Sequence, residues 1–251
     1  MSVYQKLLNV RDEKGAGFLV LLDPDRMSLP EIVDLAKKSE EGGADGFLVG
    51  SSLLLSTRFD EAVREIKANV KVPVVIFPGN ANQVSRHADA ILFLSLISGR
   101  NAHLLIGEQV KAAPAIKEFD LEPIPTGYLL IESGGTTSVQ FMSDTQPLPR
   151  NKPDIAKAHA LAAEYLGMKL VFLEAGSGAE NPVPDKIIRE VKEFVSIPIV
   201  VGGGVKDPDV AYAKVKNGAS FVVIGNFLEE DDSLINEFAD AIHISKRAKA
   251  I

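Results

Sequence analysis

The stretch that decides the fold runs from Ile197 to Asn226 and reads IPIVVGGGVKDPDVAYAKVKNGASFVVIGN. It holds two short runs in which nearly every position is apolar, Ile199–Val201 and Phe221–Ile224. Such runs are typical of parallel strands that are buried on both faces. The amphipathic stretch Pro208–Asn217 lies between them and predicts a helix, because proline favours the first helical turn and Gly218 follows as a stop. This strand–helix–strand unit predicts an α/β fold with a parallel sheet.

The same alternation extends over the whole chain. Six further apolar runs are Phe18–Leu22, Gly46–Val49, Val74–Phe77, Ala90–Leu94, Tyr128–Ile131 and Leu170–Leu173. Further amphipathic stretches are Pro30–Glu41, Phe59–Asn69, Ala102–Phe119, Pro153–Leu166, Pro184–Val195 and Ser233–Lys249. Eight strand–helix units in 251 residues predict a (β/α)8 barrel, the TIM barrel, that occupies residues 1–251 as a single domain.

The third unit departs from this pattern. Only about a dozen residues separate Phe77 from Ala90, which leaves room for one or two turns at residues 81–88. A full crossover helix with its loops needs about 10–12 residues or more. We therefore predict that the third helix is shortened or replaced by a loop. The longest irregular segment is Glu132–Lys152, rich in Gly, Ser, Thr and Pro, and loops of this length are usually functional or lie at an interface.

Composition and charge disfavour several classes of function. The chain has 27 Lys and Arg against 34 Asp and Glu, a net charge of −7, which disfavours nucleic acid as a partner. Because cysteine is absent, there is no disulfide and no thiolate zinc site, as fits a cytoplasmic protein. No apolar run is long enough to span a membrane, and residues 1–17 lack the apolar core of a signal peptide. We expect His159 and His243 to have ordinary packing or surface roles.

Glycine-rich turns follow three neighbouring strands, at the end of the barrel where such folds bind their substrates. They are Gly176-Ser177-Gly178, Gly202–Gly204 and Gly225-Asn226. Glycine permits positive φ and close approach of a ligand, and its backbone N–H groups can bind an anion. Each turn, taken alone, could simply be a tight connection between a strand and the next helix, with no role in binding. Because all three adjoin, they predict a phosphate site, although neither a dinucleotide-binding nor a P-loop pattern is present.

Two carboxylates end predicted strands at the same edge. Asp23 would lie near the hydroxyls of Ser51 and Ser52, and this set of hard oxygens suits Mg²⁺, which often binds one or two carboxylates together with phosphate oxygens. The alternative is that Asp23 caps the next helix, and a cap or turn role is the interpretation we favour for Asp25. Glu174 stands beside the predicted phosphate turns and could accept a proton from a substrate hydroxyl. Its alternative role is a structural hydrogen bond to loop amides.

Seven motifs, in order along the chain, resemble those of the geranylgeranylglyceryl phosphate synthase family. They are Leu22-Asp23-Pro24-Asp25, Val49-Gly50-Ser51-Ser52, Ile76-Phe77-Pro78-Gly79-Asn80, Pro149-Arg150-Asn151-Lys152-Pro153, Phe172-Leu173-Glu174-Ala175-Gly176-Ser177-Gly178, Gly202-Gly203-Gly204 and Gly225-Asn226. The resemblance implies a modified (β/α)8 barrel whose third helix is replaced. It also implies Mg²⁺-dependent transfer of a polyprenyl group, geranylgeranyl first, from its diphosphate to the 3-hydroxyl of sn-glycerol 1-phosphate.

The resemblance also implies roles for individual residues. Asp23 and Ser52 would bind Mg²⁺, and Glu174 would bind the glycerol hydroxyls and assist deprotonation. The residues that would hold glycerol phosphate are Phe172, Leu173, Glu174, Ala175, Gly176, Ser177, Gly178, Gly203, Gly204, Gly225 and Asn226. One departure is Phe172, where the family commonly has tyrosine, so a contact from that hydroxyl is missing here.

Other readings of the same residues stay open. The donor could carry a longer, heptaprenyl chain. Leu94, Leu96, Ile97 and Leu104 beside the short third unit could line a groove for the prenyl tail or simply form core. A sugar-phosphate isomerase or epimerase could use Asp23 and Glu174 as acid and base. A barrel that binds phosphate ligands without catalysis would share the glycines.

One aromatic residue lies in an otherwise polar loop. Phe141 and Met142 stand amid Gly, Ser, Thr and Gln in Gly134–Asp144, and exposed aromatics inside a polar rim often anchor subunit interfaces. The alternative is that Phe141 folds back onto its own barrel. Members of the resembling family form dimers or hexamers, and an aromatic in this region is associated with the larger form. We predict a homo-oligomer with Phe141 at a subunit contact, and transient membrane contact during product release.

Overall fold

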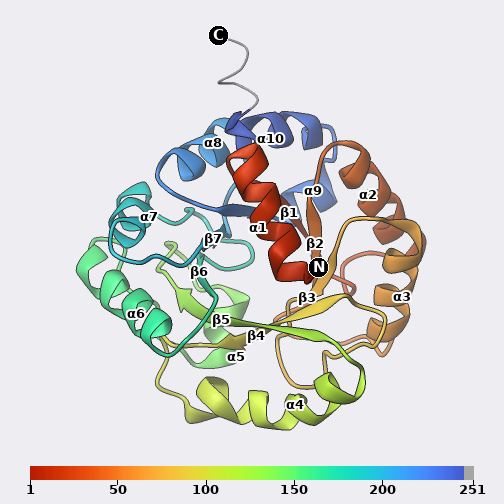
Figure 1. Ribbon diagram of the computed structural model, residues 1–251, viewed down its shortest axis with the longest axis horizontal. Helices are drawn as coiled ribbons and strands as arrows, with labels where there is room; N and C mark the ends of the chain where they lie inside the picture. Colours follow the sequence, from red (N-terminus) through yellow and green to blue (C-terminus); the bar gives the residue numbers. More distant parts are fainter. Residues whose placement is uncertain (246–251) are drawn as a thin grey trace.

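Eight parallel strands form a closed barrel in the computed structural model, which describes residues 1–245 (Figure 1). The strands are β1 (Gly17–Leu22), β2 (Gly46–Val49), β3 (Val74–Ile76), β4 (Ala90–Ser95), β5 (Glu122–Leu130), β6 (Leu170–Glu174), β7 (Ile199–Gly202) and β8 (Phe221–Ile224). Each pairs with the next in the chain, and β8 closes on β1 with Gly17 opposite Phe221. The predicted (β/α)8 barrel is therefore confirmed.

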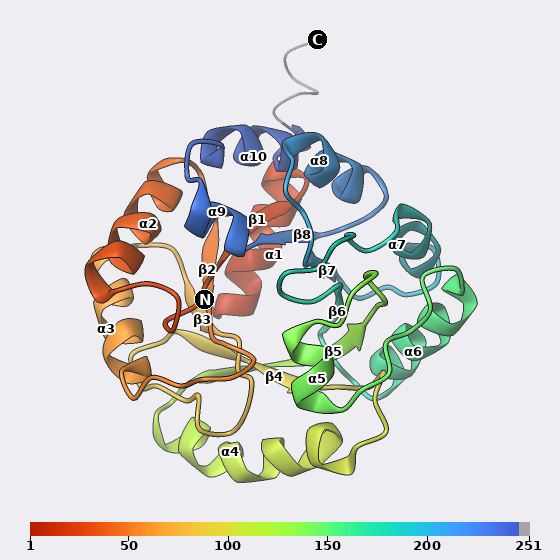
Figure 2. The same cartoon turned by 180° about the vertical axis from the view of Figure 1, so that it is seen from behind.

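Helices surround the barrel and cover its outer surface (Figures 1 and 2). They are α2 (Leu29–Glu41), α3 (Phe59–Asn69), α4 (Glu108–Glu118), α6 (Pro153–Tyr165), α7 (Asp185–Lys192), α8 (Pro208–Lys216) and α10 (Ile235–Ile242). Short elements at the ends of strands are η1 (His103–Gly107), α5 (Ser138–Ser143) and α9 (Asn226–Glu230). Alternate strand residues such as Phe18, Phe47 and Val171 pack outward against these helices, as the apolar runs require.

The third unit has no helix. Residues 77–89, all within the described part of the chain, connect β3 to β4 through turns and bends alone. Gln83, fully buried in this connection, donates from Nε2 to the carbonyl of Ser51 at 2.7 Å and accepts from the Ser51 backbone N–H at 3.1 Å. The predicted replacement of the third helix by a loop is confirmed, and one buried amide side chain holds that loop against the end of β2.

An N-terminal helix that the sequence did not predict, α1 (Val3–Lys14), closes the N-terminal end of the barrel (Figure 1). Its Val3 and Leu7 are buried against the barrel interior, where they join residues such as Leu19 and Leu48. The carboxylate of Glu122, at the start of β5, accepts hydrogen bonds from the backbone N–H groups of Val3 and Tyr4. The sequence did not predict this helix because only one narrow face of α1 is apolar, so the segment looks like a polar terminus.

Asp45 joins four elements at this N-terminal end. Its carboxylate accepts hydrogen bonds from the Phe18 backbone N–H at 2.8 Å and from Lys14 Nζ at 2.5 Å, and it lies 2.8 Å from His243 Nε2. His243 directly follows α10 and is fully buried. This histidine has the expected packing role, and its contact with Asp45 ties the last helix to β1 and α1.

Several element boundaries differ from the predicted ones. β5 begins at Glu122 rather than Tyr128. The prediction began too late because Pro123 and Pro125 interrupt the apolar run, although both lie in the strand. The predicted helix 102–119 begins with the separate turn η1, and the predicted loop Glu132–Lys152 contains α5. The predicted C-terminal helix from Ser233 is α10, and its predicted residues 246–249 lie outside the described part of the chain.

Candidate active site

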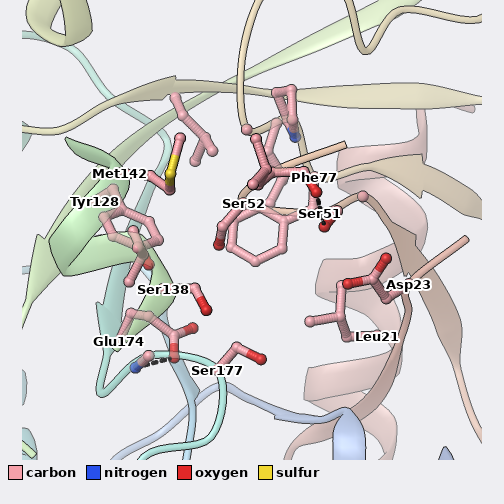
Figure 3. A pocket seen from close by; sticks show the side chains of 18 of the residues that line it. Leu21, Asp23, Ser51, Ser52, Phe77, Tyr128, Ser138, Met142, Glu174 and Ser177 are labelled. Carbon is pink, nitrogen blue, oxygen red and sulfur yellow. Dashed lines mark hydrogen bonds between the residues drawn. The ribbon is translucent and has the colours of Figure 1, made fainter. Parts of the chain in front are cut away.

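A cavity of about 610 Å³ opens among the C-terminal ends of the strands. Ten of the residues singled out in the sequence line it: Asp23, Ser52, Glu174, Gly176, Ser177, Gly178, Gly203, Gly204, Gly225 and Asn226. Figure 3 shows Glu174 and Ser177 on one side of the cavity and Asp23 and Leu21 on the other. Residues that are up to 203 positions apart in the chain therefore line one cavity, as the barrel topology requires.

Glu174 ends β6 and projects into this cavity (Figure 3). Its Oε1 accepts a hydrogen bond from the Gly176 backbone N–H at 2.6 Å. Burial raises the pKa of this carboxyl to about 7, although the amide hydrogen bonds oppose the shift. A Cβ on Gly202 would lie 2.7 Å from Glu174 Oε2, so glycine at that position leaves the room that the carboxylate occupies. A carboxyl with this pKa can accept and release a proton near neutral pH.

The glycine turns surround Glu174 with backbone rather than side chains. Gly176, Gly178, Gly203 and Gly204 all have positive φ, between +70° and +100°. The Asn226 amide lies 2.9 Å and 3.3 Å from Ser177 Oγ and so joins the turn after β6 to the turn after β8. Left-handed glycine backbone next to short polar side chains is suited to binding a phosphate group.

Asp23 ends the β1 side of the cavity, and its side chain is 17% exposed. Burial raises the pKa of Asp23, while hydrogen bonds from the Asp25 backbone and from Ser51 oppose the rise. Asp25 turns instead toward the loop after β2, where it accepts from the Ser56 backbone N–H at 2.9 Å. The structural role that the sequence favours for Asp25 is therefore the anchoring of this loop.

The end of β2 approaches the β3–β4 connection very closely. A Cβ at Gly50 or Gly79 would clash with the backbone carbonyls of Phe77 and Ser51, respectively. Ser51 and Ser52 are half-buried, and Ser52 faces the cavity across from Asp23 (Figure 3). Glycine at both positions, together with Gln83, thus fixes the backbone on which the two serines stand. Gln83 was missed by the sequence reasoning, because its partner lies on another strand end.

Three predicted site residues do not line the cavity. Phe172, Leu173 and Ala175 are buried, with exposures of 0%, 0% and 1%. The Phe172 ring stacks on Phe77 inside the barrel, with ring centroids 5.0 Å apart, and contacts Tyr128 at 5.7 Å. None of the three residues reaches the cavity surface, and the Phe172 ring packs against Phe77 and Tyr128, which do line the cavity.

Tyr128 is a site residue that the sequence reasoning missed. It lies on β5 opposite Phe172 and lines the cavity. Burial, and then the charge of Glu174, raise the pKa of its phenol well above the usual value. The phenol therefore remains a hydrogen-bond donor close to Glu174. Its only sequence signal is a polar aromatic in an otherwise apolar strand.

Another part of the cavity is lined mostly by apolar side chains and extends toward α4, where His103, Glu108 and Gln109 also line it. Of the four residues predicted to form a groove, Leu94, Leu96 and Leu104 line it and Ile97 does not. They are joined by Val84, Phe93, Ala112 and Ile116. Val84 belongs to the connection that replaces the third helix, so the missing helix and the apolar extension occupy the same sector of the barrel.

The residues at the cavity fit a magnesium ion that takes only a few of its ligands from the protein. Among residues 1–245, no cluster of three or more His, Asp or Glu side chains is arranged to hold a metal. The available donors are the Asp23 carboxylate and the Ser52 hydroxyl, both of which line the cavity. Such a sparse set of hard oxygens suits Mg²⁺, which keeps several waters and takes further ligands from substrate phosphates.

The fold and site together define a (β/α)8 enzyme in which glycine turns suited to an anion, an acidic wall and a mostly apolar extension share one cavity. The sequence profile of the PcrB family matches residues 8–243. The geranylgeranylglyceryl phosphate synthase of Chitinophaga pinensis is 46% identical over 242 residues, 96% of each chain, and that of Pyrococcus horikoshii is 44% identical over 92% of this chain and 90% of its own.

Solved structures agree with these sequence relatives. (S)-3-O-geranylgeranylglyceryl phosphate synthase from Thermoplasma acidophilum, solved with its substrate sn-glycerol-1-phosphate, superposes with a TM-score of 0.92 at 34% identity and covers 97% of this chain and 99% of its own. The chain belongs to the PcrB family, the family of geranylgeranylglyceryl phosphate synthases that its motifs resemble. The predicted family and the predicted class of enzyme, a prenyltransferase, are confirmed.

Proposed function

We propose that this protein transfers a polyprenyl group from its diphosphate to the 3-hydroxyl of sn-glycerol 1-phosphate, with geranylgeranyl diphosphate as the first candidate donor. A bond forms between the glycerol O3 and C1 of the prenyl chain, and the bond between C1 and the diphosphate oxygen breaks. The hydroxyl proton leaves and diphosphate departs with the bonding electron pair. The product is a prenylglyceryl phosphate ether.

The acceptor would lie against the glycine turns. The backbone of Gly176–Gly178, Gly203 and Gly204 would hold the phosphate, with Ser177 and Asn226 at its edge. This arrangement would place the glycerol hydroxyls toward Glu174. A relative from Thermoplasma acidophilum binds sn-glycerol-1-phosphate in the same fold, which supports this choice of acceptor.

Glu174 would take the proton from the attacking hydroxyl. Its pKa of about 7 leaves a substantial ionised fraction at neutral pH, and the proton can later pass to solvent through the cavity mouth. The allylic carbon gains cationic character as diphosphate leaves, so a weak alcohol nucleophile suffices once it is positioned. Tyr128, beside Glu174, would keep its proton and donate a hydrogen bond to a polar group in the cavity.

Asp23 and Ser52 would hold the magnesium ion that we expect this reaction to need. When bound, Mg²⁺ neutralises negative charge on the departing diphosphate. Asp23 fits this role because it is held in place by the Asp25 backbone N–H at 3.0 Å and is mostly withdrawn from solvent.

The apolar extension would hold the prenyl chain. Its lining from Leu94 to Ile116 is continuous with the polar part of the cavity, so a donor could place C1 near Glu174 and its tail toward α4. Geranylgeranyl and heptaprenyl chains remain the two candidate donors. A sugar-phosphate isomerase would leave this extension without a role.

We also propose a homo-oligomer. Phe141 is 78% exposed and Met142 48% exposed, so the alternative that Phe141 folds back onto its own barrel is not favoured. Large exposed apolar side chains on the polar α5 segment suit a subunit contact. Among residues 1–245, no helix has the length and apolar character needed to cross a membrane.

The observation that carries the proposal is the buried Glu174, which lies between backbone suited to phosphate and a long apolar extension. The test is incubation with labelled sn-glycerol 1-phosphate, Mg²⁺ and prenyl diphosphates of graded length, followed by product analysis. We expect a labelled ether lipid, and the chain length that gives the highest kcat/KM identifies the donor. Absence of ether product with every donor, from protein that is folded, would contradict the proposal.

A further inference from the structure

Arg26 is a cation at the cavity wall to which the proposed reaction has so far assigned no role. It ends the turn that follows β1, lines the cavity and is 45% exposed. Its Nη1 lies 3.3 Å from Glu229 Oε2, and its Nε lies 4.0 Å from Asp23 Oδ2. The guanidinium therefore stands directly beside the candidate metal ligand.

Glu229 forms an ion pair with this guanidinium. It lies on α9, its side chain is only 6% exposed, and its second oxygen accepts a hydrogen bond from the Asp23 backbone N–H at 3.3 Å. One buried carboxylate thus contacts both the Arg26 side chain and the Asp23 backbone. Burying such a carboxylate is costly unless a cation accompanies it, so the pair is a built feature rather than a loose surface contact.

A second contact connects Arg26 to the phosphate turns. In the amide orientation that satisfies both of its partners, Asn226 Oδ1 accepts from Arg26 Nη1 at 3.0 Å and from Nη2 at 3.2 Å. The guanidinium carries five N–H donors. Contacts to Glu229 and Asn226 engage at most three of them, so at least two remain for a ligand at the half-exposed face. A planar guanidinium with free donors binds phosphate oxygens well, often through two parallel bonds.

The cavity wall around Arg26 is rich in carboxylates, so a diphosphate would need a cation there. Asp23, Asp25 and Glu229 are gathered there, and they would repel the several negative charges of a diphosphate. Lys206 also lines the cavity, but it is on the turn after β7 and is exposed. Arg26 is the cation in the same turn as Asp23.

We propose that Arg26 binds the diphosphate group of the donor and that Glu229 positions it. This inference rests on the proposed function and assigns the side chain that would receive the diphosphate beside Asp23. The acceptor phosphate has the glycine turns as its own site, so the loss of Arg26 should weaken diphosphate binding much more than glycerol phosphate binding.

The test is calorimetric titration of the full chain with inorganic pyrophosphate and, separately, with sn-glycerol 1-phosphate, each with Mg²⁺ present. In Arg26→Gln we expect the Kd for pyrophosphate to rise about 10- to 100-fold, since a hydrogen bond to a charged group contributes about that factor. The Kd for glycerol phosphate should stay within about three-fold. Arg26→Lys, which keeps the charge but loses the planar fork, should fall between wild type and Arg26→Gln.

Two further variants separate binding from folding and general charge. Arg64→Gln makes the same change in net charge on the outer helix α3, where Arg64 pairs with Glu61 and Glu65, and it should leave both Kd values unchanged. Glu229→Gln should raise the pyrophosphate Kd less than Arg26→Gln, and in turnover it should raise the donor KM more than it lowers kcat. Melting temperatures show whether each variant is folded.

The outcomes separate this inference from the proposed function. If wild type makes no ether product, the proposed function fails while pyrophosphate binding still tests Arg26. The inference is overturned if wild type does not bind pyrophosphate, if folded Arg26→Gln binds it within two-fold of wild type, or if the loss falls on glycerol phosphate instead.

Discussion

The two ends of the barrel both contain buried carboxylates, and the two sets behave oppositely. At the N-terminal end, burial would raise the pKa of Asp45, but hydrogen bonds from His243, Lys14 and Phe18 outweigh it and lower the pKa. At the C-terminal end, burial dominates and raises the pKa of Asp23, Glu174 and Glu229.

The difference lies in the partners. Asp45 has the Lys14 ammonium, a ring nitrogen of His243 and a backbone N–H within 2.8 Å. Glu174 has only backbone amides, and its open side faces the cavity. A carboxylate whose partners are complete stabilises the fold, whereas one whose partners are incomplete is available to a ligand or a proton. In a barrel this division follows the two ends.

The largest expected effect is on the acidic wall of the C-terminal end. Asp23→Asn should nearly abolish turnover and leave the fold intact, because a neutral amide is a poor ligand for Mg²⁺. Asp25→Asn should cost far less activity, since Asp25 contacts the loop after β2. The measurement is kcat over a range of Mg²⁺ concentrations, with melting temperature as control. Equal losses in the two variants would contradict the assignment of the metal to Asp23.

A smaller loss of turnover is expected from a substitution of Glu174, beside the glycine turns. Glu174→Gln keeps the size of the side chain and removes its basicity, so turnover at pH 8 should fall by about 10²–10⁴-fold, the range for loss of a general base. Steady-state kinetics with both substrates saturating measure this. A variant within two-fold of wild type would leave Glu174 with a structural role only.

At the N-terminal end, the same kind of substitution should affect stability instead. Asp45→Asn should lower the free energy of unfolding by about 1–3 kcal/mol at pH 7, because the buried groups around Asp45 lose a charged acceptor, while kcat of the folded fraction stays the same. Denaturant unfolding measures the first quantity. A large loss of activity per folded molecule would remove the distinction between the two ends.

The sign of the pH dependence follows from the lowered pKa of Asp45. Its contribution to stability is complete above about pH 4, the usual value in an unfolded chain, and is lost as the pH falls through the folded value. In Asp45→Asn, the fall in the free energy of unfolding that protonation of Asp45 causes at low pH should be absent.

The smallest effect on the barrel itself is expected from Phe141. Phe141→Ala should lower the mass measured by light scattering and change the melting temperature of the barrel only slightly, since the side chain is 78% exposed. Tyr165→Ala, another aromatic that is 79% exposed and lies on α6, is the matched control and should leave the mass unchanged. An unchanged mass together with a large loss of stability in Phe141→Ala would place Phe141 in the core.

The fold was predictable because most strands are apolar on both faces and the glycine turns mark strand ends. The candidate site followed because parallel strands bring their carboxyl ends together. What could not be predicted depends on distant contacts. Arg26 meets Glu229 across 203 residues, and α1 buries too few side chains to show a clear pattern. Pro123 and Pro125 concealed the first half of β5, which is held by its pairing with β4.

The most direct test of the account is the pH dependence of turnover in wild type and Glu174→Gln. The account predicts that kcat/KM of wild type, which reports the ionisation of the free enzyme, rises with pH and levels off with an apparent pKa of about 7, as Glu174 loses its proton. Phosphate groups titrate at about pH 6 as well, so the comparison between the two proteins carries the test. The rising limb should be absent in Glu174→Gln. The same limb in both proteins would contradict the claim that Glu174 accepts the substrate proton.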